Sequence, residues 1–227
     1  MWLRIFVQKI HLHSLAKILE FKSKYKGGDV MNNRMILEQL MEENKGYLLA
    51  SKAIEKGVSR TILSQYVKEK GLERVARGIY ISDDVWPDEL YILQARNEKI
   101  VFCGETALYL HGLLDREYRE ICISVPRGSN VSHLNIRNLQ VKYPSQETHM
   151  LGVCEVPSTS GNLVRVYDKE RCICDLIKNR SHVDVQNFQT AMKEYMTDRE
   201  KQLSRLTQYA QMLGVRDEVM KYVEVLV

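Results

Sequence analysis

Between residues 32 and 81, the spacing of apolar positions predicts three short helices followed by a hairpin. The helical segments are "NNRMILEQLMEENKG" (32–46), "LLASKAIEKG" (48–57) and "VSRTILSQYVKEKG" (58–71), in which apolar side chains recur at helical spacing. Asn32 or Asn33 is the expected N-cap of the first helix, and Ser59 is the expected N-cap of the third. Gly46 and Gly57 are expected to end the first two helices.

The inward faces of the second and third segments follow from the same spacing. The second is expected to bury Ala50, Ala53 and Ile54. The third is expected to bury one stripe made of Ile62, Leu63, Tyr66 and Val67. Two strands, 72–75 and 79–81, are predicted to follow around Ala76-Arg77-Gly78, where Gly78 supplies the positive φ of a tight turn.

The outer face of the third segment carries hydrogen-bonding side chains. A helix, a glycine turn and a second helix with a polar face are typical of a helix-turn-helix, whose second helix enters the major groove of DNA. A two-stranded wing behind that helix lays arginines along the neighbouring DNA backbone or minor groove. The expected contacts with double-stranded DNA are made by Ser59, Arg60, Thr61, Ser64, Gln65, Lys68, Arg74 and Arg77.

A second interpretation of the same segment stays open. Winged helices that bind only protein have the same elements, and charged helix faces are usually just solvated. In that case Arg74 and Arg77 pair with Glu73 or Glu69, and the third helix packs against another domain.

Beyond residue 82 the pattern changes, and we expect a domain boundary near Asp83, where Asp83, Asp84 and Pro87 interrupt the chain. Helices are predicted at 87–99 and 105–114. Strands are predicted at 100–104, 120–126, 139–143, 152–157 and 163–168, and the chain is helical from 169 to the end, including one helix over 198–214. In the strand 120–126, Ile121, Ile123 and Val125 alternate with Cys122 and Ser124. The predicted fold class is α+β: an N-terminal winged helix-turn-helix (31–82), then a mixed α+β domain ending in helices (83–227).

Charge separates these regions. Residues 31–80 hold nine Lys/Arg against six Asp/Glu, whereas residues 81–227 hold 18 against 21. The excess of basic residues in the first region favours an anionic partner there. At 44% hydrophobic and 27% charged, the composition is that of a globular protein. No apolar run approaches the ~18 residues that span a bilayer, so no membrane partner is expected.

Residues 1–30 have a doubtful status as a leader. The segment has a basic start but lacks a continuous apolar region and a small-residue cleavage site, so it is a poor signal peptide. Lys26-Gly27-Gly28-Asp29 is what AAAGGAGGTGAT encodes, a near-ideal bacterial ribosome-binding sequence, and Met31 follows at a suitable distance. One hypothesis is therefore that translation starts at Met31. The alternative is a genuine extension, possible as a basic amphipathic helix at a membrane surface.

Catalytic patterns are weak. "FCGETALYLHG" followed by "REICIS" is similar to nucleotidyltransferases. Those enzymes bind Mg²⁺ through two acidic residues that alternate along a strand. In this chain Glu120 is the first acid, but Cys122 occupies the position of the second. His111 is expected at a helix end, and Tyr167 and Asp168 are expected to end a strand and cap a helix. Five cysteines form no CxxC pair, and Cys172 and Cys174 are expected as buried thiols of a cytoplasmic protein. We expect no cofactor, no metal and no enzyme activity.

Four stretches together resemble one family. These are "GYLLASKAIEKGVSRTILSQYVKEKGLERVARGIYI" (46–81), "VFCGETALYLHGL" (101–113), "ICISVPRG" (121–128) and "VRVYDKERCICDLI" (164–177). They are similar to AbiEi-type antitoxins, predicted transcriptional regulators of viral defence by abortive phage infection, and the resemblance covers most of 33–195. The final helices, beyond about residue 197, fit that family less clearly and are candidates for a dimerisation or partner surface.

The resemblance implies a transcriptional autorepressor and antitoxin of a bacterial toxin–antitoxin operon. Its N-terminal domain would bind inverted repeats in its own promoter, with a homodimer on DNA as one arrangement. Its second part would counter a toxin of nucleotidyltransferase type without forming a stable complex with it. Basic residues carry over at Arg60, Lys68, Arg74 and Arg77. The alternatives are a degenerate or active nucleotidyltransferase that uses Glu120, or a winged helix that binds protein alone.

Overall fold

The computed structural model describes residues 28–134 and 136–226, so the predictions for residues 1–27 lie outside the described residues. The chain divides into two compact units between Pro87 and Asp88, five residues beyond the boundary expected at Asp83. Each unit has its own sheet and its own hydrophobic core. Among the described residues, no helix is long and apolar enough to cross a membrane.

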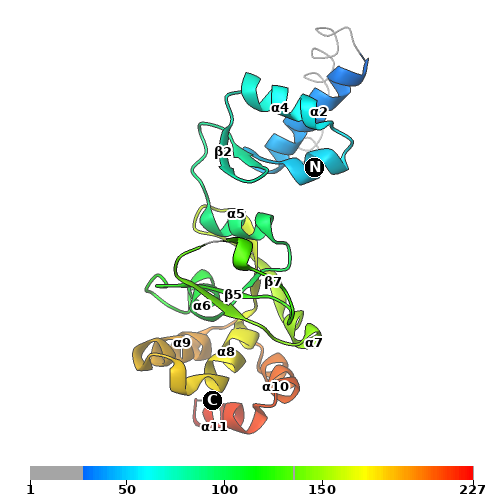
Figure 1. Ribbon diagram of the computed structural model, residues 1–227. Helices are drawn as coiled ribbons and strands as arrows, with labels where there is room; N and C mark the ends of the chain where they lie inside the picture. Colours follow the sequence, from blue (N-terminus) through cyan, green and yellow to red (C-terminus); the bar gives the residue numbers. More distant parts are fainter. Residues whose placement is uncertain (1–27, 135, 227) are drawn as a thin grey trace, which may run out of the picture. The chain divides into compact units, whose positions relative to one another are not determined.

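The first unit has the element order of a winged helix-turn-helix (Figure 1). Helix α2 spans Gly28–Glu43, and α3 (Ala50–Glu55) and α4 (Arg60–Glu69) follow as the helix pair. Strands β1 (Tyr47–Leu49), β2 (Glu73–Ala76) and β3 (Ile79–Ile81) form an antiparallel sheet in the order β1-β3-β2. The predicted fold of this region is therefore confirmed.

The core of this unit lies where the helices meet the sheet. Its buried side chains come from α2, β1, α3 and α4, and the turn before α4 adds Val58: Leu37, Leu40, Leu48, Ala53, Val58, Leu63 and Tyr66. Full burial of a Leu or Val side chain stabilises the folded state by about 1.5–3 kcal/mol relative to exposure. The stripe predicted on the third helix is confirmed in Leu63 and Tyr66, and Ile62 and Val67 pack beside it half-buried.

Three sequence predictions for this unit are wrong. Asn32 and Asn33 do not cap α2, because the helical backbone already begins at Gly28 and runs through both residues. The predicted second helix is too long, since Leu48 and Leu49 belong to β1, whose hydrogen bonds to β3 bury them. Ile54 does not face inward but is 43% exposed, because the short helix α3 turns only Ala53 fully into the core.

The second unit is built on a five-stranded mixed sheet in the order β6-β5-β4-β8-β7 (Figure 1). The strands are β4 (Val101–Phe102), β5 (Ile121–Ser124), β6 (Leu139–Lys142), β7 (Val153–Pro157) and β8 (Leu163–Tyr167). Between them lie α5 (Glu89–Arg96), α6 (Gly104–Leu110), the short helix η1 (Ser132–Leu134) and α7 (Gln146–His149). The side chain of Gln94 on α5 forms two hydrogen bonds of 2.8 Å with the backbone N and O of Arg165 on β8. These backbone groups lie beyond the end of the two-residue strand β4, which pairs with β8 only through Phe102 and Val166.

Strand β5 is buried on both faces. Apolar residues alternate with Cys122 and Ser124 along it, yet Cys122 and Ser124 are as buried as their apolar neighbours. The reason is the position of β5 between β4 and β6, with packed side chains on each side of the sheet. A strand in the interior of a covered sheet has no solvent face.

The chain after β8 is helical, as predicted. It forms α8 (Lys169–Lys178), the short helix η2 (Arg180–His182), α9 (Val185–Thr197), α10 (Leu203–Met212) and α11 (Arg216–Leu226). The single helix predicted over 198–214 is wrong in its first five residues. Asp198 accepts a hydrogen bond of 2.8 Å from the backbone N of Glu200, and such local side-chain bonds compete with a helix.

Candidate nucleic-acid interface

Helix α4 presents a polar face that is held in place by a buried one. Leu63 and Tyr66 are both 5% exposed and anchor the helix in the core. On the other side, Arg60, Thr61, Ser64, Gln65 and Lys68 are all exposed. Burial raises the pKa of Tyr66 to about 12, with Glu38 and Glu69 adding to the shift, so this ring stays neutral as a core side chain should. Packing thus fixes which face of α4 is free to make contacts.

The start of α4 favours an anion. Ser59 is the N-cap, as predicted, and its Oγ accepts a hydrogen bond of 3.3 Å from the backbone N of Ile62. The first turn holds Arg60 and no acidic residue. The N-terminus of a helix carries a partial positive charge and unpaired N–H groups, so phosphate is attracted to it. The cap uses one acceptor position of Ser59 but leaves its O–H available as a donor.

The wing is a tight hairpin. Ala76 pairs with Ile79, so Arg77 and Gly78 form a two-residue turn, and Gly78 has the positive φ of 75° that was predicted for it. The backbone N of Ala50 donates to the carbonyl of Gly78 at 2.8 Å, which ties the tip to the start of α3. The register shifts between Arg74 and Ala76, which leaves Val75 in a bulge. Bulges of this kind re-aim side chains at a sheet edge.

Three cations of this unit form ion pairs with glutamates. Arg34 on α2 lies 2.5 Å from Glu69 on α4, Lys70 lies 3.2 Å from Glu38, and Lys56 lies 3.9 Å from Glu43. Within residues 28–134 and 136–226, no such pair involves the predicted DNA-contacting cations Arg60, Lys68, Arg74 and Arg77. The pairing that the protein-binding alternative requires for Arg74 and Arg77 is not formed: Glu69 pairs with Arg34, and the Nε of Arg74 donates to the carbonyl of Ala76 at 3.3 Å.

All eight predicted contact residues therefore lie on two consecutive elements, the exposed face of α4 with its cap and the β2–β3 wing. All eight residues are exposed, and the four cations among them form no ion pair with a carboxylate in the described chain. Their contact with DNA stays a prediction.

Of the residues in the nucleotidyltransferase-like stretch, Cys122 and Glu105 have hydrogen-bond partners within the fold. Glu120 is exposed just before β5, and the Sγ of Cys122 donates to Oε1 of Gln140 at 3.1 Å. Glu105 accepts a hydrogen bond of 2.8 Å from Asn187 and so joins α6 to α9. In the described ranges, no group of three or more His, Cys, Asp or Glu side chains is spaced to hold a metal.

The remaining predictions for single residues in this unit are confirmed. Cys172 and Cys174 are buried on α8, and burial raises the pKa of the Cys174 thiol to about 12. Tyr167 ends β8, and Asp168 caps α8 by accepting a bond of 2.8 Å from the backbone N of Arg171. His111 is the C-cap residue of α6, its Nε2 lies 2.8 Å from the carbonyl of Tyr167, and burial lowers its pKa.

Comparison with known proteins bears on the first unit above all. A search of the curated proteins finds no match. Among solved structures, the chain is similar to the crystal structure of the RV2827C protein from Mycobacterium tuberculosis, with 13% sequence identity and a TM-score of 0.49 over 78% of this chain and 70% of that one. Residues 31–116 match the family described as "Transcriptional regulator, AbiEi antitoxin N-terminal domain". Residues 31–116 are therefore similar to the N-terminal domain of AbiEi antitoxins, which are transcriptional regulators, and this agrees with the resemblance found in the sequence.

Proposed function

We propose that this protein is a DNA-binding autorepressor and antitoxin of a bacterial toxin–antitoxin operon. The observation that supports this best is the set of exposed cations on α4 and the wing, which have no carboxylate partner in the described chain, whereas Arg34, Lys56 and Lys70 of the same unit each pair with a glutamate. Cations without a carboxylate partner are available to neutralise phosphates. Each phosphate of DNA that is neutralised releases condensed counterions, and this release favours binding.

In the proposed complex, α4 enters the major groove with its N-terminal end first. Thr61, Ser64 and Gln65 face the base edges, whereas Arg60 and Lys68 lie towards the phosphates on either side. The wing places Arg74 and Arg77 on the adjacent backbone or minor groove. A homodimer on inverted repeats would place two such helices about one helical turn of DNA apart.

The proposed antitoxin role belongs to the whole chain. Its functional partner is a nucleotidyltransferase-type toxin, which it counters without a stable complex and without catalysis of its own. If this holds, the Glu120→Gln variant neutralises the toxin as well as the wild-type chain does. A loss of neutralisation together with Mg²⁺-dependent nucleotide transfer by the wild-type chain would instead support the nucleotidyltransferase alternative.

The DNA-binding part is tested with the chain's own promoter. Fluorescence anisotropy at several salt concentrations compares a duplex of the upstream region with a shuffled duplex of the same composition. We expect preferential binding to the promoter.

Arg77→Ala should weaken binding to both duplexes and reduce the salt slope by about one, whereas Gln65→Ala should reduce the preference for the promoter over the shuffled duplex. The matched control is Lys56→Ala, which removes an exposed cation that already has a carboxylate partner. Equal binding of both duplexes by all four proteins contradicts the proposal.

A further inference from the structure

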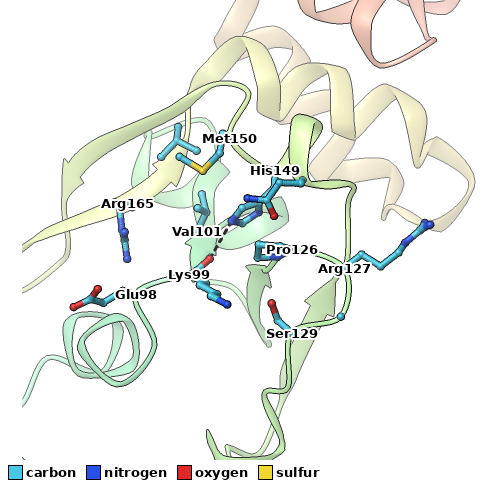
Figure 2. Close-up of a pocket in the computed structure, with 12 residues that line it drawn as sticks. Glu98, Lys99, Val101, Pro126, Arg127, Ser129, His149, Met150 and Arg165 are labelled. Carbon is cyan, nitrogen blue, oxygen red and sulfur yellow. Dashed lines mark hydrogen bonds between the residues drawn. The ribbon is translucent and has the colours of Figure 1, made fainter.

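A cavity of about 350 Å³ opens in the second unit, at the sheet edge where β5 ends and β4 begins (Figure 2). Its polar walls come from the loop before β4, the turn after β5, α7 and β8. Apolar side chains, among them Val101, Met150 and Val153, complete the lining. Nothing in the proposed DNA-binding mechanism uses this cavity.

The floor of the cavity is a buried hydrogen-bond network centred on His149, which is 2% exposed. Its Nε2 lies 3.0 Å from the carbonyl O of Lys99, and because a carbonyl only accepts, Nε2 carries the proton (Figure 2). Nδ1 therefore accepts from the Ser124 hydroxyl at 3.2 Å, and that hydroxyl accepts from Tyr167 at 2.7 Å. Burial lowers the pKa of His149, so the ring is neutral and serves to fix the walls.

One wall is the turn Pro126-Arg127-Gly128-Ser129, closed by a hydrogen bond of 3.0 Å from the backbone N of Ser129 to the carbonyl of Pro126. Gly128 has a φ of 86°, which the third position of a type II turn requires. Arg127 belongs to the lining, but its side chain is exposed and extends away from His149 (Figure 2). Its long chain can swing over a ligand.

Cations outnumber carboxylates around this space. Lys99, Arg127 and Arg165 line the cavity from three separate elements, whereas Glu98 is the carboxylate in the lining. Glu155 stands opposite Arg165 in the β7–β8 register. In the part of the chain that the structure describes, none of these three cations forms an ion pair with a carboxylate. Three cations against one carboxylate leave the lining of the cavity with a net positive charge.

We propose that this cavity binds a small phosphorylated metabolite of about mononucleotide size. Arg165 and Lys99 hold the phosphate from the walls, Arg127 swings back to contact it, and Val101, Met150 and Val153 contact the organic part. Guanidinium groups suit phosphate because they form two parallel charge-assisted hydrogen bonds with it. Ligand sites range over roughly 300–1,000 Å³, so a cavity of this volume fits one nucleotide and excludes a duplex.

The test is isothermal titration calorimetry of the full chain with AMP, with adenosine and acetate as comparisons. We expect saturable binding of AMP, and none of adenosine or acetate. Arg165→Gln and, separately, Lys99→Gln should each weaken AMP binding about tenfold, because each removes a charge-assisted contact. The matched control is Arg119→Gln, an exposed arginine of the same unit outside the cavity, which should bind AMP as the wild-type chain does.

The outcomes separate this site from the DNA-binding surface. Inorganic phosphate should compete with AMP, and Arg77→Ala should leave AMP binding unchanged even where it weakens promoter binding. The proposal is overturned if AMP and inorganic phosphate do not bind, or if both glutamine variants bind AMP like the wild type. It is also overturned if only a short DNA duplex binds these residues. A thermal melt of each variant without ligand shows whether it is folded.

Discussion

The two units use polar side chains in opposite ways. With tyrosines set aside, every buried polar or charged side chain in residues 32–134 and 136–224 belongs to the second unit: Asp88, Gln94, Thr106, Ser124, His149, Ser158, Asn162, Glu170 and Arg171. The first unit has an apolar interior and keeps its polar residues outside. Buried polar groups are costly unless every one of them is paired, and a fully paired network holds one arrangement of the chain.

That contrast separates a recognition surface from a structural interior. In the second unit, Ser158 and Asn162 both donate to Asp88, and Tyr195 donates to Glu170 at 3.2 Å. These side chains have their partners within the fold. In the first unit, the predicted contact cations on α4 and the wing make no ion pair within the described chain. Their substitution should therefore affect binding more than folding. Four predictions test this difference.

The largest effect should come from removing three cations of the first unit together, in the variant R60A/R74A/R77A. Each makes no ion pair in the described chain, so the unfolding midpoint should change little. Promoter binding at ~0.1 M salt should fall by about a hundredfold or more, and the salt slope should drop by about three. Fluorescence anisotropy gives the binding data and a thermal melt gives the stability. Promoter affinity equal to that of the wild-type chain would show that these cations do not form a DNA-binding surface.

The next effect concerns a buried hydroxyl of the second unit. Ser124→Ala leaves the hydroxyl of Tyr167 and the Nδ1 of His149 without their short contact to Ser124, which should destabilise this unit by about 1–3 kcal/mol. The matched change in the first unit is Ser64→Ala, which removes an exposed hydroxyl and should alter stability by less than ~0.5 kcal/mol. Urea unfolding followed by circular dichroism measures both. Equal destabilisation by the two changes would remove the distinction between the units.

A third difference should appear on acidification. Burial lowers the pKa of His111 and of His149 in the folded second unit, whereas residues 31–87 contain no histidine. Below pH ~6.5, the usual pKa of histidine, these two histidines bind protons in the unfolded chain but stay neutral in the folded unit. The stability of the second unit is therefore fully present above that pH and falls as the pH drops. Thermal melts at pH 7 and pH 5 should show a lower midpoint for the second unit and little change for the first. The opposite order of sensitivity would count against neutral buried histidines.

The smallest effect should come from a paired cation of the first unit. Arg34→Ala removes the ion pair with Glu69, whose two side chains are 30% and 49% exposed. Surface pairs of this kind stabilise by about 0–1 kcal/mol, so the midpoint of chemical unfolding should shift slightly. Promoter affinity should stay within about twofold of the wild-type value. A loss of affinity as large as that of Arg77→Ala would mean that pairing does not distinguish the paired cations from the predicted contact cations.

The sequence was informative where local chemistry decides the structure. Ser59, Gly57 and Gly78 each have a local role as cap, helix end or turn, and each was predicted correctly. Strand β1 was missed because Tyr47–Leu49 is three residues long and runs into α3 without a break. The burial of Ser124 was missed because its partner His149 lies 25 residues further along the chain, and only the tertiary fold brings the two together. The cavity beside His149 depends on the same long-range packing.

The most direct test of the account is hydrogen–deuterium exchange of the full chain with and without its promoter duplex. If the first unit binds DNA through α4 and the wing, amides in residues 59–69 and 73–81 become protected, while those of β5, β8 and α8 exchange as before. Protection that is confined to residues 88–226, with none on α4 or the wing, would contradict the central claim.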